Sequence, residues 1–534
     1  MSPNGKEAIK AILGELPYTA ELYTMIRHRG QPPRTRFSLK GLHDLLPELG
    51  EQAAALRKEG RPGKKIFIFA SLHYWIESAA SIGLALASQG HDVTLGYLPF
   101  SDYKVPINRF DLRRQNIYAQ KVLGKVNGLL NAVSFLNCRP CSENLPDEIK
   151  EAVHEVTIYD CQYTSQVEEV DPDSPLYKLR LRRNEDAARV AWNYFHEKRP
   201  QLLLVPNGTI QEFGVIYRIA EYLRIPRVTF EFSDRKENIW LAQNSEVMQQ
   251  ETDALWKARQ GEKLTNKQLD SVRQLYAARK QAALWENFSR RWQGQPTQGG
   301  EKARKALKLD KRPIVLLATN VVGDSLTLGR QVYTKTMTEW LLRTVQYFSG
   351  KPDVQLVIRV HPGEMLLKGG VSISDVIHRE QSKLPDHIHL VGPKDPTNTY
   401  DLISIADLGL VYTTTVGLEM ALSGVPVIVN GKTHYRNRGF TIDPDSFVNY
   451  FKILGQILAD PDAHRLTRKQ VDEAWRYAYY FFFEFPRPFP WHLWQQAEDL
   501  KERPMKYVFS SEGQKKYRRT FDFLAGEPMD WTKI

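Results

Sequence analysis

The stretch LVYTTTVGLEMALSGVPVIVNG, from Leu410 to Gly431, decides the fold of the second half of the chain. It begins with a short apolar run that ends in three threonines, and a segment typical of a helix starts near Val416. A second apolar run, from Val425 onward, follows directly. Continuous runs of this kind are typical of strands buried on both faces of a parallel sheet. The stretch therefore predicts a strand, a crossover helix and a parallel neighbouring strand.

The same alternation of strands and helices extends outward from this unit. Strands that alternate with helices form parallel, doubly wound sheets, so we expect an α/β protein with two such domains that face a cleft. The expected strands of the first half lie at 64–70, 92–98, 155–160, 200–208 and 226–232, and those of the second half at 312–321, 354–360, 387–392, 407–413 and 425–431. The helices expected in the second half lie at 333–348, 400–406, 416–423 and 446–459.

Composition divides the chain of 534 residues into five segments. Residues up to about 60 are polar and helical in character, and a Gly-, Pro- and Gln-rich linker precedes the second set of strands. The expected segments are a helical lead (1–60), an N-terminal domain (61–245), a helical insert and linker (246–303), a C-terminal domain (304–475) and a helical tail (476–534).

The net charge of +11 and the pI near 9.2 favour an anionic partner, such as a nucleotide, a phospholipid surface or an acidic glycan. No motif of a nucleic-acid-binding fold is evident, so we expect no nucleic-acid partner. No apolar run approaches the roughly 18 residues of a membrane span, and the N-terminus lacks the apolar region of a signal peptide. We therefore expect a cytoplasmic protein.

The stretch QLVIRVHPGE, from Gln355 to Glu364, ends a predicted strand in donor groups. Strand alternation puts Arg359 and His361 on the same face, and Pro362 stiffens the turn that follows. Both side chains can donate to phosphate oxygens, and ligands of doubly wound sheets bind outside the carboxyl ends of the strands. The alternative is a histidine whose hydrogen bonds are satisfied by the local backbone.

The opening stretch holds a second candidate for anion binding. Hydroxyls of Thr413, Thr414 and Thr415, together with N–H groups where a helix begins, favour an anion there. Gly417 permits a close backbone approach, and Glu419 could reach a sugar hydroxyl. The alternative is that the threonines only cap the helix and that Glu419 is a favourable charge in its first turn.

Carboxylates and amides mark the strand ends of the first half. Asn207 and Gly208 end one strand, and the helix that follows contains Glu212. Glu231 and Asp234 lie at the end of the next strand. A carboxylate at such a position could take a proton from an acceptor hydroxyl. The loop after the first strand of the second half aims further polar side chains at the same cleft: Asn320, Asp324 and Ser325.

Three stretches carry a resemblance to a known family. TNVVGDS, VIRVHPGE and VYTTTVGLEMALSGVPVIVNGKTHYRNRGFT occur in this order, and together they resemble the bacterial capsule polysaccharide biosynthesis and export family of glycosyltransferases, which includes Kdo transferases. The resemblance implies a GT-B fold of two Rossmann-like domains, a nucleotide-sugar donor and inverting transfer without a metal or other cofactor.

The resemblance also implies roles for individual residues. His361 and Pro362 match a His-Pro motif that contacts the donor phosphate, and Thr414, Thr415 and Gly417 match a Ser/Thr-Val-Gly segment. In a GT-B domain, the loop after the strand at 387–392 holds the nucleotide base. Candidate residues in this loop are Gly392, Pro393, Asn398 and Tyr400; the alternative is an ordinary turn capped by Thr399.

The chain departs from its relatives at the catalytic base. Related enzymes carry an acidic-acidic-Gly or Glu-Asn-Gly signature where this chain has Glu231-Phe232-Ser233-Asp234. The base is therefore either Glu231 or Asp234, and a CMP-Kdo donor is not assumed.

We expect a glycosyltransferase that adds a sugar to a surface polysaccharide or its lipid-linked precursor. Its partners would be a nucleotide-sugar donor and a glycan or glycolipid acceptor. An inner-membrane surface is a further candidate partner, because the aromatic tail around Phe481, Phe482, Phe483, Trp491 and Trp494 would suit docking there. Packing against the domains is the alternative for this tail. For the whole chain, the alternatives are a GT-B sugar-nucleotide epimerase, a polyol-phosphate transferase and a non-catalytic scaffold of capsule assembly.

Overall fold

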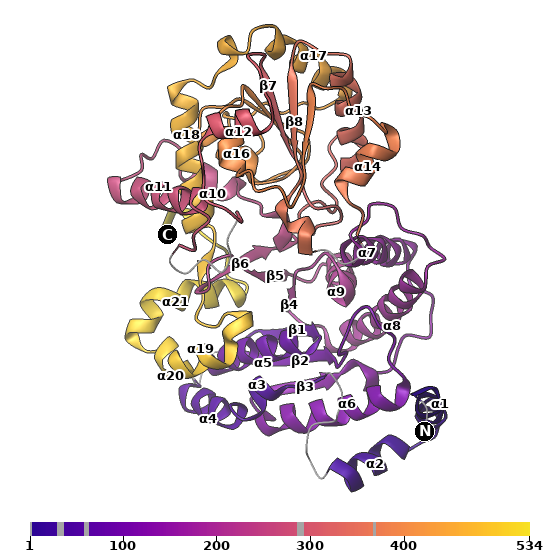
Figure 1. Cartoon of the computed structure of the whole chain (residues 1–534). Coiled ribbons are helices and arrows are strands. Elements are labelled where there is room, and N and C mark those ends of the chain that lie inside the picture. Colours follow the sequence, from indigo (N-terminus) through magenta and orange to yellow (C-terminus); the bar gives the residue numbers. More distant parts are fainter. Residues whose placement is uncertain (1–2, 29–36, 58–62, 286–292, 367–369, 534) are drawn as a thin grey trace. The chain divides into compact units, whose positions relative to one another are not determined.

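The computed structural model describes residues 3–28, 37–57, 63–285, 293–366 and 370–533. The chain forms two compact units (Figure 1). Unit 1 comprises Met1–Asp160, Asp171–Met248 and Arg487–Asp530, and unit 2 comprises Cys161–Val170, Gln249–Pro486 and Trp531–Ile534. The expected helical lead and most of the expected tail are thus part of unit 1. The expected insert at 246–303 belongs almost wholly to unit 2, and the boundary expected at residue 60 lies outside the described residues.

Unit 1 is built around a seven-stranded sheet in the order β12-β6-β5-β4-β1-β2-β3. Strands β1 to β5 run parallel, whereas β6 is antiparallel to β5 and β12 is antiparallel to β6. The central strand β1 is buried along its length beyond its first residue, as its continuous apolar run requires. The strands are β1 (Lys65–Ser71), β2 (Asp92–Leu98), β3 (Leu130–Ser134), β4 (Leu202–Pro206), β5 (Arg227–Phe232), β6 (Asn238–Gln243) and β12 (Arg487–Pro488).

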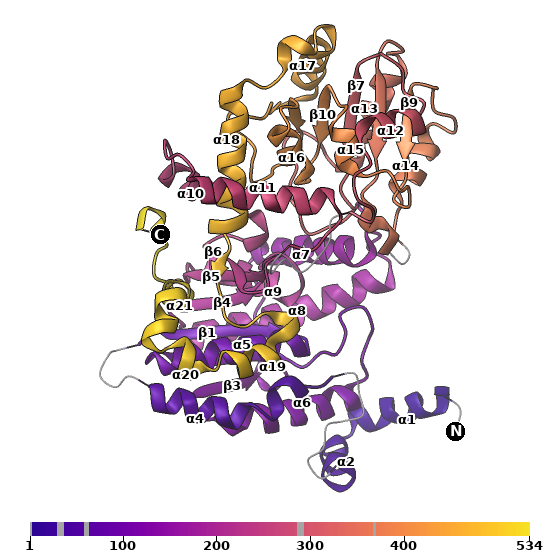
Figure 2. The same cartoon turned by 60° about the vertical axis from the view of Figure 1, so that its left-hand side comes forward.

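Helices cover this sheet, with α5 against β1 and β2 and α9 against β4 and β1. The last segment of the chain also returns to unit 1, where α20 contacts α4 and α21 contacts β12 (Figure 2). The helices are α1 (Pro3–Glu15), α2 (Thr19–His28), α3 (Lys40–His43), α4 (Leu46–Leu56), α5 (His73–Ser88), α6 (Arg109–Leu123), α7 (Asp147–Ser165), α8 (Pro175–Lys198), α9 (Gln211–Tyr222), α19 (Gln496–Glu502), α20 (Met505–Val508) and α21 (Ser511–Leu524).

One expected strand of unit 1 is wrong. Residues 155–160 lie inside α7. The buried positions of this helix include Ile149, Val153, Val156 and Asp160, which recur every three or four residues. That spacing is the period of a helix, and it outweighs the local run of β-branched residues. The strands β3, β6 and β12 were not expected; β3 and β12 have no long apolar run, and the apolar run of β6 is only four residues long.

Unit 2 has a five-stranded, wholly parallel sheet in the order β11-β10-β7-β8-β9. All five strands expected in this half are confirmed, and so is the strand–helix–strand unit of the opening stretch. The strands are β7 (Ile314–Ala318), β8 (Gln355–Arg359), β9 (Ile388–Val391), β10 (Leu408–Val411) and β11 (Val427–Val429). The helices are α10 (Asp253–Ala258), α11 (Asn266–Lys280), α12 (Gly300–Ala306), α13 (Met337–Ser349), α14 (Ile373–Glu380), α15 (Thr399–Ile403), α16 (Val416–Leu422), α17 (Phe447–Ala459) and α18 (Arg468–Tyr479).

Both sheets are wound in the same way. The first strand of each parallel set lies between the second and the fourth, so the strand order reverses between β1 and β4 in unit 1 and between β7 and β10 in unit 2. In open α/β sheets, ligands bind at this reversal, outside the carboxyl ends of the strands. Two Rossmann-like units in one chain are the composition of the GT-B class, which confirms the expected fold class.

The aromatic cluster near the C-terminus is mostly buried, which favours the packing alternative over docking at a membrane. Phe481 and Phe482 are buried in a π-helical turn (Tyr480–Glu484) of unit 2. Trp491 is buried in the core of unit 1, where its ring meets Phe521. Trp494, in contrast, is exposed. Chain segments with this many aromatic residues cover the units rather than extend from them.

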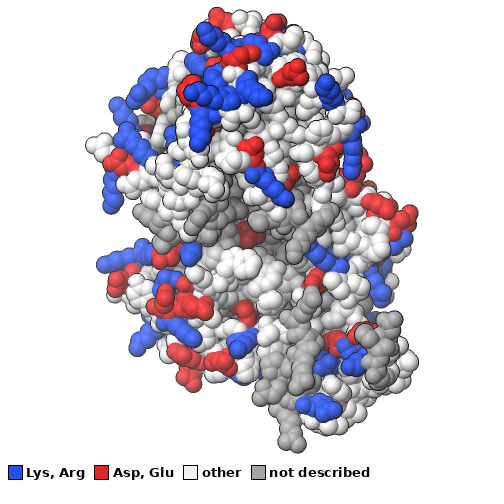
Figure 3. All heavy atoms as spheres, in the orientation of Figure 1, with Lys and Arg blue, Asp and Glu red and all other residues white. Residues whose placement is uncertain are grey.

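Charged side chains of both signs are interspersed on the face of the molecule shown in Figure 3. Lys and Arg occur on both units and do not form a single continuous stripe on this face. On this face, the positive net charge is spread rather than gathered into one patch.

Candidate functional site

The loops that follow three neighbouring strands of unit 2 are tied together at the strand reversal. The Asn320 side-chain oxygen, after β7, accepts a hydrogen bond of 3.1 Å from the backbone N–H of Thr413, after β10. The hydroxyl of Thr319 accepts one of 3.1 Å from the backbone N–H of His361, after β8. The structure thus brings together Asn320, His361 and Thr413, which were proposed from separate stretches of sequence.

Local hydrogen bonding sets the tautomer of His361. The backbone N–H of Gly363 donates to Nδ1 of the His361 ring at 3.0 Å. An Nδ1 that accepts a hydrogen bond carries no proton, so Nε2–H is the donor of the neutral ring. A Cβ atom at Gly363 would lie 2.8 Å from Nδ1, so this position requires glycine. Pro362 begins a 3-10 turn, Pro362–Leu366, directly after the histidine.

The threonine segment combines a buried hydroxyl with a tightly packed turn. Thr413 is buried, and its hydroxyl makes no hydrogen bond within the described part of the chain. The Tyr435 hydroxyl donates to the carbonyl of Thr414 at 2.5 Å, and a Cβ atom at Gly417 would lie 2.4 Å from that hydroxyl. Gly417 is therefore required by the packing of Tyr435. Thr415 precedes α16 without a side-chain cap.

Arg359 braces the loop after β9. Its guanidinium donates to the carbonyl of Gly392 at 2.7 Å and lies 3.5 Å from the hydroxyl of Thr399. Burial lowers the pKa of Arg359, and Asp395 partly offsets this effect. Arg359, which was expected to contact a phosphate, therefore also links β8 to the loop expected to hold the nucleotide base.

The residues of the expected base loop divide into two groups. Gly392 and Pro393 are partly exposed, and a Cβ atom at Gly392 would meet no atom within 4 Å. Asn398 caps α15 through a 2.8 Å hydrogen bond from the backbone N–H of Tyr400, and its amide donates to the carbonyls of Lys280 and Gln295. Tyr400 is buried. Asn398 and Tyr400 therefore hold the loop in place. Gly392 and Pro393 are the part of the loop open to a ligand.

Glu419 lies in a buried ion pair. Its carboxylate accepts a hydrogen bond of 2.5 Å from Arg279 of α11, whose guanidinium lies over the ring of Phe482. Glu419 thus links α16 to α11. Asp324 and Ser325 lie half-buried in the turn after β7, where the Ser325 hydroxyl donates to the Asp324 carboxylate.

The ends of β4 and β5 in unit 1 place Glu231 beside Asn207. The Asn207 side chain donates to one oxygen of Glu231 at 3.2 Å, and the backbone N–H of Phe232 donates to the other at 3.1 Å. Burial raises the pKa of Glu231 to about 7, although both hydrogen bonds lower it. Asn207 has a φ of 59°, and a Cβ atom at Gly208 would lie 2.7 Å from Thr229.

The other two expected carboxylates of unit 1 have different surroundings. Glu212 is buried, forms an ion pair of 3.0 Å with Arg180 and accepts a hydrogen bond from Ser71. Arg180 also pairs with Asp160, so Glu212 belongs to a buried charge network. Asp234 lies half-buried in the turn between β5 and β6. With a pKa of about 7, Glu231 suits a general base near neutral pH.

Sequence reasoning missed the segment after β1, which lies directly at the strand reversal of unit 1. Leu72 has a φ of 67°, which is strained for a residue with a branched side chain, and it immediately precedes His73. The Nδ1 atom of His73 is buried without a hydrogen-bond partner among the described residues, and burial lowers the pKa of His73. A histidine directly after the central strand was the available signal.

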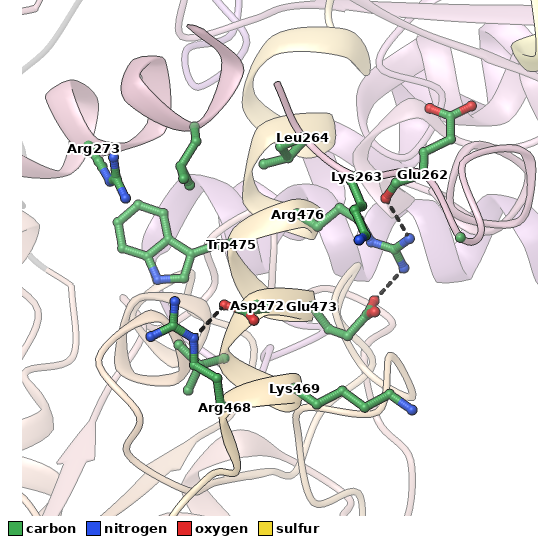
Figure 4. A pocket seen from close by; sticks show the side chains of 13 residues that line it. Glu262, Lys263, Leu264, Arg273, Arg468, Lys469, Asp472, Glu473, Trp475 and Arg476 are labelled. Carbon is green, nitrogen blue, oxygen red and sulfur yellow. Dashed lines mark hydrogen bonds and ion pairs between the residues drawn. The ribbon is translucent and has the colours of Figure 1, made fainter. Parts of the chain in front are cut away.

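The pockets of unit 2 lie mostly away from these residues. One pocket of about 880 Å³ is formed by the turn before α11 and by α18 (Figure 4). Trp475 lies between Arg273 and Arg468 in this pocket, and Arg468 pairs with Asp472 at 3.0 Å. None of the expected site residues lines it. A second pocket of about 560 Å³ includes Tyr400 among its lining residues.

The described residues contain neither a cluster of metal ligands nor a membrane-spanning helix. No group of three or more His, Cys, Asp and Glu side chains there is arranged to hold a metal ion. No helix in the described ranges has the length and apolar character needed to cross a membrane.

No family model and no curated protein matches the chain. Solved structures with a low similarity include KpsC of Thermosulfurimonas dismutans, a β-Kdo 2,4-transferase (13% identity, 55% of this chain, 83% of that chain, TM-score 0.34). Others are the UDP-GlcNAc 2-epimerase of Neisseria meningitidis (12% identity, 78% and 99%, TM-score 0.26) and sucrose-phosphate synthase of Thermosynechococcus elongatus (12%, 82% and 97%, TM-score 0.28). The first is a Kdo transferase, the kind of enzyme that the sequence motifs resemble. At TM-scores this low, the likenesses carry no argument about function.

Proposed function

We propose that the chain is a glycosyltransferase that moves a sugar from a nucleotide-sugar donor to a glycan or glycolipid acceptor. The observation that supports this most is the environment of Glu231, a carboxylate at the end of a parallel sheet with a pKa near 7. A carboxylate of this pKa is about half ionised at pH 7, and its ionised form can take a proton from a hydroxyl. The proposed reaction inverts the anomeric centre and requires no metal.

We assign the catalytic base to Glu231 rather than Asp234. Asn207 and the backbone of Phe232 each donate to one oxygen of Glu231, which fixes the orientation of the carboxyl group. Burial disfavours its charged form, so the ionised carboxylate gains by accepting a proton. In the proposed reaction, Glu231 accepts the proton of the acceptor hydroxyl while that oxygen attacks the anomeric carbon of the donor.

We assign the donor phosphate to the strand reversal of unit 2. The Nε2–H of His361 and the hydroxyl of Thr413 are donors there, on loops that Asn320 and Thr319 hold together. Donors placed in advance stabilise the negative charge that grows on the departing nucleotide. Gly392 and Pro393 would contact the nucleotide base, and Asn398, Tyr400, Arg359 and Glu419 would position these loops.

The acceptor is proposed to be a surface or capsular polysaccharide or its lipid-linked precursor, and the site of action the cytoplasmic face of a membrane. The positive net charge of +11 supports an anionic acceptor or surface. The base of the donor nucleotide is left to experiment.

A binding titration of the purified chain against CMP, CDP, UDP, GDP and ADP tests the donor half of the proposal. We expect one nucleotide to bind selectively and His361→Ala to weaken its binding about tenfold to 100-fold, because one hydrogen bond to a charged phosphate is lost. His378→Ala is the matched control, since this exposed histidine lies on α14 and, among the described residues, bonds to the carbonyl of Ser374 in its own helix.

Either of two results would contradict the proposal. The first is that none of the five nucleotides binds, which would favour a non-catalytic scaffold. The second is that His361→Ala binds the nucleotide as the unaltered chain does. Turnover of the nucleotide sugar without any acceptor would instead identify a sugar-nucleotide epimerase, and a preference for a CDP-alcohol would identify a polyol-phosphate transferase.

A further inference from the structure

The first two helices present apolar stripes to solvent. Ile9, Ile12 and Leu16 follow one another along α1 and its end, and Leu22, Met25 and Ile26 do so along α2. The spacing of three or four residues puts each set on one face of its helix. Ile12, Met25 and Ile26 are 65%, 67% and 69% exposed. Residues 9–26 thus hold a continuous run of large exposed apolar side chains, far more than scattered surface residues would supply.

The opposite face of this pair of helices is anchored on α6. Gly14 and Ala20 are buried, and a Cβ atom at Gly14 would lie 2.8 Å from the backbone of Phe110. The ring of Tyr23 packs edge-on against Phe110 at 5.5 Å, and Arg114 lies over the same tyrosine. Both helices lie against α6 (Figures 1 and 2), so the packed faces leave the apolar stripes exposed.

Charges on this surface are unevenly compensated. All three acidic side chains of the pair are neutralised within unit 1: Glu7 pairs with Lys10, Glu15 with Arg109 and Glu21 with Arg113. Lys6 and Arg27, in contrast, have no ion-pair or hydrogen-bond partner among the described residues, and both are exposed. The surface therefore combines an apolar stripe with uncompensated positive charge.

A cavity of about 570 Å³ lies beside the end of α1. Its lining includes Glu15 and Arg109, which also form the ion pair that anchors α1. Most of the remaining lining is apolar; Arg182 and Arg183 add two positive charges, and Asp186 adds one negative charge. An apolar cavity with cations beside an exposed amphipathic helix fits an anionic amphiphile.

We propose that the surface formed by α1 and α2 docks on an anionic phospholipid bilayer. An amphipathic helix pair of this kind lies in the interface, with its apolar face among the acyl chains and its cations near the lipid phosphates. A second copy of the chain would bring two equally cationic surfaces together, whereas an anionic bilayer complements them. The inference rests on the proposed function, which places the chain at a membrane face, and names the surface that would contact the membrane; it does not depend on the donor-site assignment.

Sedimentation of the full chain with vesicles tests this surface. We expect binding to vesicles of phosphatidylcholine and phosphatidylglycerol at a ratio of about 70 to 30 that weakens with added salt, and little binding to phosphatidylcholine alone. The double variant Ile12→Glu/Met25→Glu should lose at least tenfold in vesicle affinity, and Lys6→Glu/Arg27→Glu should lose binding to the anionic vesicles. The matched control is Val448→Glu, which alters an isolated side chain of unit 2 that is 82% exposed.

The proposal is overturned if the unaltered chain ignores anionic vesicles or if Ile12→Glu/Met25→Glu binds them like Val448→Glu. A dimer of the unaltered chain without vesicle binding would also overturn it, provided that light scattering shows Ile12→Glu/Met25→Glu to be a monomer. The surface would then join two copies of the chain. Circular dichroism establishes that each variant is folded. The nucleotide titration uses no vesicles, so its outcome and this one are distinguishable.

Discussion

The pKa of Glu231 is raised because its surroundings bury the carboxyl group and supply no cation among the described residues. Glu231 belongs to no ion pair among the described residues, and its hydrogen bonds come from one amide and one backbone N–H. Its pKa is therefore near 7, whereas the ion-paired Glu212 has its pKa lowered by Arg180 against the effect of burial. These two carboxylates differ chiefly because Glu212 has a cationic partner and Glu231 has none among the described residues.

Glu231→Gln should abolish transfer and stabilise the fold above neutral pH. A raised pKa means that the folded state binds the proton more tightly than the unfolded state, so this stability is complete below pH 4.5 and is lost as the pH rises through about 7. The variant cannot ionise and should exceed the unaltered chain by about 3 kcal/mol in free energy of unfolding at pH 8, with almost no difference at pH 4.5. Urea titrations at the two pH values measure this.

Asp234→Asn is the control for the base. Asp234→Asn should keep most of the transfer activity. For the unaltered chain, kcat/KM should rise as the pH increases through about 7 and then remain constant, because Glu231 must be ionised to act as the base. Loss of activity in Asp234→Asn with activity retained in Glu231→Gln would reverse the assignment of the base.

The turn between β4 and α9 is an element held in a costly conformation by a buried charge network. Asn207, Gly208 and Gln211 all have positive φ. The carboxylate of Asp160, from α7, accepts a hydrogen bond from the backbone N–H of Gln211, and Arg180 of α8 joins Asp160 to Glu212 of α9. The network therefore fixes the loop that carries Asn207 and, through it, Glu231.

Arg180→Met should destabilise unit 1 by about 3–5 kcal/mol, because two buried carboxylates lose their partner. The triple variant Asp160→Asn/Arg180→Met/Glu212→Gln removes the charges as well and should recover most of this loss. Urea unfolding of both variants measures the difference. Equal stability of the single and the triple variant would show that the network contributes packing rather than charge compensation.

A long segment near the C-terminus belongs to unit 1. After the long segment Gln249–Pro486 of unit 2, Arg487–Asp530 adds the edge strand β12 and three helices to unit 1. Phe489, Trp491 and Phe521 from this segment belong to the same hydrophobic core as β1 and α5. Aromatic residues whose sequence suggested docking at a membrane therefore complete a hydrophobic core. The strand β1 of that core lies more than 400 residues earlier in the chain.

Trp491→Ala and Trp494→Ala should separate these roles. Trp491 is buried and its indole N–H donates to the carbonyl of Arg503 at 2.9 Å, so its loss should cost about 3–5 kcal/mol. Trp494 is 74% exposed, and its loss should change the free energy of unfolding by less than about 1 kcal/mol. Urea unfolding followed by circular dichroism provides the comparison, and equal effects would contradict the role given to the returning segment.

The sequence by itself determined the class of fold and much of the candidate site. Continuous apolar runs separated by helical segments identified nine of the ten expected strands, because a strand buried on both faces has few polar positions. Their ends then located Glu231, His361 and Thr413, because ligands of such sheets bind at the carboxyl edge. The strand expected at 155–160 failed, since a local β-branched run carries less information than the helical period around it.

Only the tertiary structure decided which polar residues hold the fold and which remain for a ligand. Arg359, Asn398, Glu212 and Glu419 were candidates by position, yet each has a partner contributed by another part of the chain. The tertiary structure also decided the pKa of Glu231, the tautomer of His361 and the exposure of the apolar stripes on α1 and α2. These properties depend on burial and on long-range partners, which the order of residues along a single element does not contain.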